Sequence, residues 1–443
     1  MARSQRKQVI HHIVDVLLTG PWQEQALLDR VRSALTEPHP WMAQLIADLL
    51  QDFSSRRPSP WTLRAFISNS SVFQSVWADK ARRPKISGFL CEPAAMEAPV
   101  PALSHLRLPQ LATSADLAVW LGLSFGQLDW FADPLGLQGR MKEGATHHYI
   151  YHWHQKREGP PRLIESPKSR LKTIQREILQ KILDPVPLHN AAHGFCKGRS
   201  CRSYVAPHAE KEVVIRFDLQ DFFPSIPSGR VHAVFRSLGY PWETARLLTG
   251  LCTHTAIDLF RDLPAHERHP WQVRRKYLQP HLPQGAPTSP ALANLCTFRL
   301  DCRLSGLARS LDLDYTRYGD DLAFSGGQEL LRKSEWLQVR VGAIAQEEGF
   351  QLNMRKIKLM RRGRRQQLAG LVVNAGANIP RSDYDQLKAI LHNCVRFGPQ
   401  SQNRIGHDDF KSYLAGKLAW VNSVNPARGQ RLSALFSQIE WEV

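Results

Sequence analysis

Residues 315–324 read YTRYGDDLAF, and this stretch decides the fold of the chain. The aromatic and apolar residues of this stretch predict a strand and a turn, with Asp320 and Asp321 at the bend. About a hundred residues earlier, residues 213–218 read VVIRFD, which predicts a buried strand that ends in the carboxylate of Asp218. Asp-rich dipeptides are common in turns, so the pair at the bend alone would say little about function.

Three carboxylates that converge on one point repel each other unless cations lie between them. The chemistry that uses such a cluster is two-metal phosphoryl transfer, in which Mg²⁺ ions about 3.5 to 4 Å apart activate a hydroxyl and stabilise the leaving pyrophosphate. We therefore predict nucleotidyl transfer, with Asp218, Asp320 and Asp321 as the catalytic carboxylates and metal ligands, and two Mg²⁺ ions as the cofactor.

The charge balance of the chain indicates its partner. Its 443 residues include 58 Lys and Arg against 40 Asp and Glu, which gives a formal net charge of +18. The excess is uneven, because seven of the eleven residues 355–365 are basic. This pattern favours a nucleic acid as the polyanionic partner over a role of the charge in solubility alone.

The cysteines and the hydropathy pattern indicate where the protein works. The seven Cys residues are scattered and contain no C-x-x-C pair, which predicts neither a disulfide framework nor a zinc finger. No window approaches about 18 uninterrupted apolar residues, so no membrane partner is expected. We predict a cytoplasmic, bacterial protein once the family resemblance below is included.

Several ordered motifs resemble those of reverse transcriptases. Residues 318–321, YGDD, resemble the Y-x-D-D box of that family. Residues 217–226, FDLQDFFPSI, resemble its first palm motif, and residues 282–290, LPQGAPTSP, resemble the motif that positions template and nucleotide. Residues 190–200, NAAHGFCKGRS, are similar to the N-A-x-x-H signature and the G-F-x-x-G-R-S run of bacterial retrons. The chain is identified as a member of the retron-type reverse transcriptases, with a resemblance that covers roughly residues 105–443.

One motif departs from the retron pattern. The V-T-G triplet of retrons is here Leu368-Ala369-Gly370. The departure implies that the family's usual contact with its own RNA is altered, and it leaves open a neighbouring, retron-like class of defence reverse transcriptase.

The resemblance implies an α+β fold, the right-hand polymerase. Fingers and palm, the latter with an antiparallel sheet, would occupy residues 105–370, and a helical thumb would occupy residues 371–443. Residues 1–104 would form a helical N-terminal extension. From the residues themselves we expect a hairpin over 147–164, an amphipathic helix over 171–183, and a surface loop or short hairpin over 258–279.

The resemblance also implies roles for individual residues, which fall into three groups. The incoming nucleotide would contact Lys156 and Arg162 through its triphosphate, the backbone N–H groups of Asp221 and Phe222, the ring of Phe223 beneath the sugar, and Gln284. The template-primer and the partner RNA would contact Gly285, which borders the template-primer beside Gln284, as well as Asn190, His193, Arg199, Arg361, Arg362, Arg364 and Arg365. Lys356 would supply a proton or a positive charge to the leaving pyrophosphate, although a solvated phosphate-binding lysine is an equally good interpretation.

The activity that the resemblance implies is RNA-templated DNA synthesis from dNTP substrates. In retrons, a cognate structured non-coding RNA is template and primer through an internal 2′-hydroxyl, and the cDNA product stays joined to it as branched RNA–DNA (msDNA). Such systems usually serve antiphage defence and include an effector protein. The alternatives are another retron-like or group II intron-like reverse transcriptase, or a catalytically silent RNA-binding scaffold. Only some seventy residues follow Asn374, which leaves little room for an intron-type extension.

Overall fold

The computed structural model describes residues 2–36, 40–54, 57–81, 83–87, 95–138, 147–156, 160–256, 259–261, 263–264, 269–404 and 406–441. The chain divides into two compact units, Met1–Ala95 and Met96–Val443. The sequence analysis placed the end of the N-terminal extension at residue 104, nearer the polymerase core. Residues between Ala95 and that point contact α10 (Ser228–Ser237) of the second unit: Glu97 forms an ion pair with Arg236, and the Val100 N–H donates to the Ser237 carbonyl at 3.0 Å.

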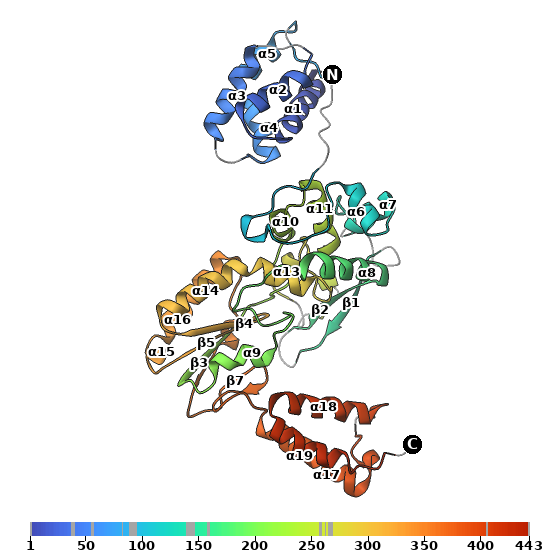
Figure 1. The fold of residues 1–443 in the computed structure, drawn as a ribbon, viewed down its shortest axis with the longest axis vertical. Helices are drawn as coiled ribbons and strands as arrows, with labels where there is room; N and C mark the ends of the chain where they lie inside the picture. Colours follow the sequence, from blue (N-terminus) through green and yellow to red (C-terminus); the bar gives the residue numbers. More distant parts are fainter. Residues whose placement is uncertain are drawn as a thin grey trace. The chain divides into compact units, whose positions relative to one another are not determined.

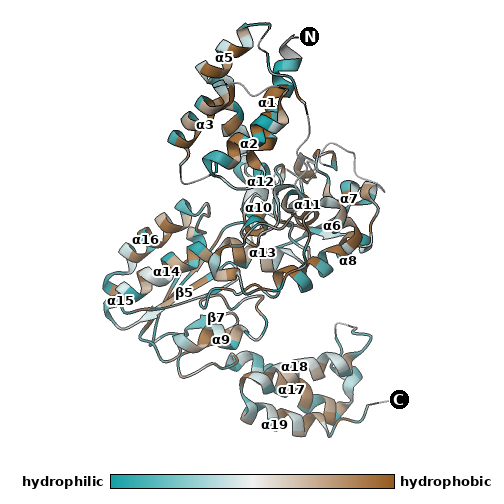
Figure 2. Ribbon diagram, turned by 45° about the horizontal axis from the view of Figure 1, so that its top comes forward, coloured by the Kyte–Doolittle hydropathy of each residue, from teal (hydrophilic) through white to brown (hydrophobic). Residues whose placement is uncertain are grey.

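The described part of the first unit is helical. It contains α1 (Ala2–Leu18), α2 (Glu24–Ala34), α3 (Pro40–Asp52), α4 (Pro60–Asn69) and α5 (Ser71–Ala78). Ser59 and Ser70 begin α4 and α5 by accepting hydrogen bonds from the backbone N–H groups of Thr62 and Phe73. The apolar faces meet in a core of the unit's own that includes Ile13, Leu27 and Leu45 (Figure 2). This unit therefore has the core that a separate domain needs.

A four-stranded antiparallel sheet lies at the centre of the second unit. Its order is β4 (Asp314–Tyr318), β5 (Asp321–Gly326), β3 (Val213–Asp218), β6 (Lys358–Arg361). β3 is central and buried on both faces, which explains its nearly continuous apolar run. In the register of β3 and β5, Asp218 lies directly opposite Asp321. The pairing therefore brings the end of β3 beside the turn between β4 and β5.

Two different cores cover the two faces of this sheet. Ile215, Phe217 and Phe324 pack with the helices α14 (Phe298–Ser310) and α16 (Ser334–Glu347), which lie side by side over the sheet in Figure 1. Val214 and Ala323, which alternate with them, belong to the cluster that includes the C-terminal helices. The period-two alternation of strand side chains thus assigns each residue of β3 to one of the two cores.

The expected hairpin is confirmed as β1 (Tyr149–His154) and β2 (Arg162–Pro167), paired antiparallel. Gly159, at its predicted turn, lies outside the described residues. The helix expected over 171–183 is α8 (Ser169–Ile178), followed by a π-helical turn, Leu179–Leu183.

The expectation of a loop or short hairpin over 258–279 was wrong for its last part, which forms the helix α12 (Trp271–Tyr277). Val273 and Tyr277, four residues apart, are buried against Leu163 and Phe260. Three basic residues lie between Val273 and Tyr277 in the sequence, so the segment was interpreted as a surface loop.

The C-terminal part of the second unit is helical, as expected. After the short strands β7 (Gln367–Leu368) and β8 (Leu371–Val372) come α17 (Arg381–Phe397), α18 (Phe410–Val424) and α19 (Pro426–Phe436). Leu391, Leu414 and Leu432 contribute one residue from each helix to the core of this part. The other α-helices in the described part of the second unit are α6 (Ser114–Trp120), α7 (Phe125–Ala132), α9 (Cys201–Val205), α11 (Trp242–Cys252), α13 (Ser289–Cys296) and α15 (Glu329–Arg332). Of the helices described, none is long and apolar enough to cross a membrane.

The close approach of α7 and α11 generates a stability prediction. A Cβ added at Gly250 in α11 would clash with the backbone carbonyl of Ala132 in α7, whereas one added at Gly306 in α14 would meet open space. We expect Gly250→Ala to destabilise the protein by about 1 to 3 kcal/mol through overpacking. Gly306→Ala, the matched control, should stabilise it by roughly 0.5 to 1 kcal/mol through helix propensity. Calorimetric melting temperatures check both signs, and equal shifts would contradict the packing.

Candidate active site

The three carboxylates lie where β3 ends and β4 turns into β5. The Leu219 N–H, directly after Asp218, donates to the Asp320 carbonyl at 2.9 Å, and the Asp218 carbonyl accepts from the Asn353 N–H at 2.8 Å. Gly319 has a φ of 64°, which glycine adopts at little cost and which the tight turn requires. Backbone hydrogen bonds thus hold the end of β3 against the Asp320 turn and against the segment at Asn353.

Two basic side chains are paired with these carboxylates. Lys356 Nζ lies 2.8 and 3.1 Å from the two carboxylate oxygens of Asp218. The Arg216 guanidinium donates twice to Oδ1 of Asp321, from Nε at 2.8 Å and from Nη2 at 2.6 Å. Arg216 precedes Asp218 by two residues on β3, so their side chains emerge on the same face of the sheet.

Burial changes the acidity of the two aspartates at the turn. Burial raises the pKa of the Asp320 carboxyl, and the charge of Asp218 raises it further. Burial raises the pKa of Asp321 to about 6, although the Arg216 charge and its hydrogen bonds act in the opposite direction. Removing carboxylates from water disfavours their charged form, so this site favours any cation that can replace the missing hydration.

The donor chemistry of the site fits a divalent metal ion. Carboxylate oxygens are the ligands that Mg²⁺ prefers, and Asp218, Asp320 and Asp321 present them at one end of the sheet. Within the described ranges, no three His, Cys, Asp or Glu side chains form a group that could hold a metal. Two of the three carboxylates, those of Asp218 and Asp321, form ion pairs with Lys356 and Arg216 in this structure.

The residues expected to hold the nucleotide come mainly from two segments, the turn that follows β3 and the β1–β2 hairpin with the residues beside it. Asp221 has a φ of 48° in the turn that follows β3. The Phe223 ring lies between those of Phe222, at 5.4 Å, and Phe195, at 6.2 Å between centroids. On the fingers side, burial and the neighbouring Arg162 charge lower the pKa of Lys156.

The charges of Lys156 and Arg162 interact with those of the acidic residues of the site. Lys156 interacts with the charges of Asp221 and Asp218, and Arg162 lowers the pKa of Asp320. The structure therefore brings together the expected catalytic carboxylates and the expected basic triphosphate ligands.

The retron signature loop packs directly on a catalytic strand. The His193 N–H donates to the Arg317 carbonyl, and the Arg317 N–H donates to the Ala191 carbonyl, both at 2.7 Å. Arg199 donates to the backbone carbonyls of His189, at 2.7 Å, and of Asn190, at 3.2 Å. His193 Nδ1 lies 2.9 Å from the Ser203 hydroxyl, and burial lowers the pKa of His193 to about 4. Arg199 and His193 thus hold the loop in shape.

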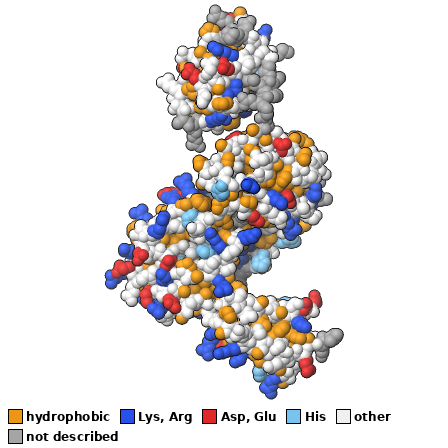
Figure 3. All heavy atoms as spheres, in the orientation of Figure 1, with side chains coloured by type: hydrophobic (Ala, Val, Ile, Leu, Met, Phe, Trp, Pro, Cys, Tyr) orange, Lys and Arg blue, Asp and Glu red, His pale blue; other side chains and the backbone are white. Residues whose placement is uncertain are grey.

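The four arginines expected to bind RNA are exposed at the other end of the sheet. In the β3–β6 register, Arg361 lies opposite Val213, the first residue of β3, while Asp218 is the last. Arg362 forms an ion pair with Glu212 at 2.8 Å. Among the basic residues of 355–365, Lys356 pairs with Asp218. The structure does not bring Arg361, Arg362, Arg364 and Arg365 to the carboxylates. Lys and Arg side chains are also spread over the face of the second unit in Figure 3.

Comparisons with known proteins agree with this geometry. The sequence of residues 154–395 matches the family described as "Reverse transcriptase (RNA-dependent DNA polymerase)". Over 338 residues, the chain is 37% identical to the Retron Mx65 reverse transcriptase of Myxococcus xanthus, covering 75% of this chain and 73% of that one. The chain belongs to the retron-type reverse transcriptases. The Retron Mx162 reverse transcriptase of the same organism is 36% identical over 352 residues, covering 75% and 68% of the two chains. The Retron Ec86 reverse transcriptase of Escherichia coli is 30% identical over 280 residues, covering 63% and 77%.

Family membership confirms the predicted fold and activity. This reverse transcriptase is an RNA-directed DNA polymerase with the right-hand fold, in which the four-stranded sheet is the palm and β1–β2 belongs to the fingers. The family uses divalent metal ions.

Sequence reasoning missed several residues that shape this site. Arg216 was visible as the one basic side chain in VVIRFD, two positions before Asp218. Phe195 is half exposed with a φ of 60°, and its ring lies 6.3 Å from that of Tyr318. Arg317 is fully buried and donates to Asp301 at 2.8 and 2.7 Å and to the Gly319 carbonyl at 3.1 Å. Nothing in the sequence paired Arg317 with Asp301.

The Arg216–Asp321 pair generates a prediction about pH. Because Arg216 lowers the pKa of Asp321, Arg216→Met should raise that pKa. A protonated carboxyl binds metal poorly, so polymerase activity should disappear at a higher pH in this variant as the solution is acidified. Initial rates of dNTP incorporation from about pH 5 to about pH 8 test the shift. Arg216→Lys should shift the profile less, and a superimposable Arg216→Met profile would contradict the coupling.

Proposed function

We propose that this enzyme copies a cognate structured non-coding RNA into DNA, starting from an internal 2′-hydroxyl of that RNA and yielding branched RNA–DNA. The observation that carries this proposal is the backbone pairing of the retron signature loop with β4, between His193, Ala191 and Arg317. Through it, the segment that resembles retrons is attached to the strand that leads into the Asp320-Asp321 turn. The retron reverse transcriptases named above support the same interpretation.

The chemistry of the proposed reaction follows from the carboxylates and their neighbours. Asp218, Asp320 and Asp321 would hold two Mg²⁺ ions, which when bound activate the priming hydroxyl and stabilise the departing pyrophosphate. Lys356, now 2.8 Å from Asp218, has the reach to place its charge beside that pyrophosphate once the carboxylate engages a metal. Lys156 and Arg162 bind the triphosphate from the fingers side, where their charges already interact with this site.

Selection of the sugar is assigned to the ring of Phe223. The ring is half-buried and packs near the rings of Phe222 and Phe195, so it cannot easily move aside for an additional 2′-hydroxyl. The backbone N–H groups of Asp221 and Phe222 face the triphosphate, an arrangement of oriented amides that suits anions. Gln284 and Gly285 border the template-primer.

The biological partners of the enzyme follow from the same proposal. They are the cognate RNA, its cDNA, dNTPs and an effector protein in an antiphage defence system. Asn190, His193 and Arg199 contribute to RNA binding by shaping the loop that they hold together. Arg361, Arg362, Arg364 and Arg365 add positive charge at the far end of the palm sheet.

Priming can be tested in cells that express the gene with its flanking DNA. We expect a DNA that co-purifies with the enzyme and remains joined to RNA until a 2′,5′-debranching enzyme releases it. The double variant Asp320→Ala and Asp321→Ala should yield none of it while remaining folded and bound to RNA, because these side chains serve the metal site rather than the core. A product that is linear before debranching would overturn 2′-hydroxyl priming but not polymerase activity.

The sugar gate is tested by Phe223→Ala. Removing the ring should admit NTPs and reduce dNTP efficiency, because Phe223 also packs against Phe222. Single-nucleotide incorporation with dNTP and NTP pairs measures the discrimination. Phe298→Ala, at an exposed ring on α14, is a control that should leave it unchanged. If Phe223→Ala discriminates between dNTP and NTP as strongly as the parent enzyme, another residue selects the sugar.

The salt dependence of RNA binding tests the four exposed arginines, Arg361, Arg362, Arg364 and Arg365. Binding to phosphates releases condensed counterions, so neutralising these four side chains should flatten the log–log salt slope by about 0.7 to 0.9 for each phosphate that is no longer bound. The contribution of Arg362 should be smallest, because Glu212 already pairs with it. Filter binding in a KCl series measures the slope, with Arg332→Gln, at an exposed pair on α15, as the control. An unaltered slope in the quadruple variant would place the RNA surface elsewhere.

A further inference from the structure

A buried pair of ionisable side chains takes no part in the function described so far. Glu165 on β2 and His281 are fully buried, and His281 Nε2 lies 3.0 Å from Glu165 Oε2. Burial alone would lower the pKa of His281, but the charge and hydrogen bond of Glu165 raise it above its ordinary value. Burying ionisable groups costs desolvation free energy. The contacts that the pair makes with neighbouring segments indicate its role.

Glu165 holds the backbone of Gln284 from both sides. Its N–H donates to the Gln284 carbonyl at 2.9 Å, and its carboxylate Oε2 accepts from the Gln284 N–H at 3.3 Å. Gly285 follows with a φ of 142°, and a Cβ there would lie 2.8 Å from the Glu165 carbonyl oxygen. A residue with a side chain would therefore push the two segments apart. One residue of the fingers hairpin thus contacts two consecutive residues of the template-facing loop.

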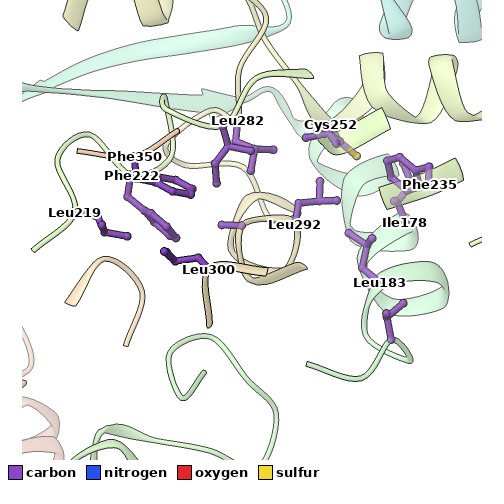
Figure 4. Packing of buried hydrophobic residues seen from close by; sticks show 14 of the residues in the cluster. Ile178, Leu183, Leu219, Phe222, Phe235, Cys252, Leu282, Leu292, Leu300 and Phe350 are labelled. Carbon is purple, nitrogen blue, oxygen red and sulfur yellow. The ribbon is translucent and has the colours of Figure 1, made fainter. Parts of the chain in front are cut away.

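The other end of this segment is attached to the nucleotide side of the palm. The Leu282 N–H donates to the Ile226 carbonyl at 3.1 Å, and the Ser228 N–H donates to the Pro280 carbonyl at 2.9 Å. The Leu282 side chain lies in the same core cluster as Phe222, as the close view in Figure 4 shows. The segment from Pro280 to Gly285 therefore bridges the chain that follows Phe223 and the strand that carries Arg162.

We propose that Glu165, supported by His281, is a positioning residue that sets the distance between the triphosphate-binding hairpin and the Gln284-Gly285 loop, and so determines how well the incoming dNTP binds. Arg162 and Glu165 belong to the same short strand, so a movement of one moves the other. The inference rests on the proposed roles of Arg162 and Gln284. Glu165 touches neither the carboxylates nor the metals in this scheme, so the chemical step should be affected little.

Single-nucleotide kinetics on a synthetic RNA template with a DNA primer test this proposal. Glu165→Leu removes the acceptor for Gln284 and should raise the KM for dNTP roughly tenfold, with kcat reduced less than about threefold. Glu165→Gln keeps an acceptor oxygen and should rescue most of the KM. Amide exchange at Gln284 should be faster in Glu165→Leu, a readout that needs neither metal nor substrate.

Gln175→Leu is the matched control for a loss of stability alone. Gln175 is equally buried in this region and donates to the Tyr149 hydroxyl at 3.0 Å and to the Leu251 carbonyl at 2.9 Å. This variant should lower the melting temperature while the KM for dNTP stays within about twofold of the parent. If Glu165→Leu and Gln175→Leu change the KM alike, the positioning role is overturned.

A second variant keeps the proposal testable if Glu165→Leu does not fold. His281→Gln removes the imidazole that pairs with Glu165 but retains a side-chain donor, and it should also raise the KM for dNTP. The double variant with Glu165→Gln should then show no additional effect, because both changes act on one interaction. Unchanged KM in folded Glu165→Leu, or in His281→Gln where the first does not fold, would overturn the inference. The synthetic template-primer makes these outcomes independent of whether the cognate RNA primes from a 2′-hydroxyl.

Discussion

The repulsion between carboxylates at the end of the palm sheet is the constraint on which the rest of the active site depends. The register of β3 and β5 places Asp218 opposite Asp321, and the turn adds Asp320 beside them. Such a cluster is stable without metal only where cations offset its charge, and Lys356 and Arg216 do so here. Arg216 lies on β3 itself, and Lys356 comes just before β6, which pairs with β3, so the strand that carries Asp218 also organises its counter-ions.

Buried polar groups around Arg317 on β4 also hold the turn, because Arg317 donates to the Gly319 carbonyl. Arg317 is fully buried and is neutralised by Asp301, with further donation to the Asn294 side chain at 2.9 Å. Asn294 in turn donates to the Gly194 carbonyl at 2.9 Å. Removing one partner of such a network would leave an uncompensated buried charge, so its members depend on each other. Through it the signature loop and the catalytic turn act as one structural unit.

The sequence predicted those parts of the site that depend on neighbouring residues along the chain. Apolar runs that end in Asp218 and the YGDD turn predicted the strands, and the ordered motifs predicted the family. Glu165 and His281, separated by more than a hundred residues, gave no local signal, because tertiary pairing alone brings them together. The helix α12 was missed for a different reason: Val273 and Tyr277 carry its apolar face, and basic residues surround them in the sequence. Local periodicity in the sequence predicts helices and strands. Buried polar pairs between two such elements can be identified only once the fold is known.

The one departure from the retron motifs becomes interpretable in the same terms. Leu368-Ala369-Gly370 forms the tight turn between β7 and β8, with Leu368 paired to Leu371 and fully buried. Replacing Val by Leu at the first position is thus a change within the core and presents nothing to a partner. Ala369 and Gly370 lie at the tip with φ values of 44° and 80°, so the backbone of this turn is left-handed at both residues. A Thr at the middle position would carry a hydroxyl at the tip, which Ala369 lacks. An altered contact with RNA stays a prediction, and it concerns the middle position, where Ala369 is partly buried against the core of the C-terminal part.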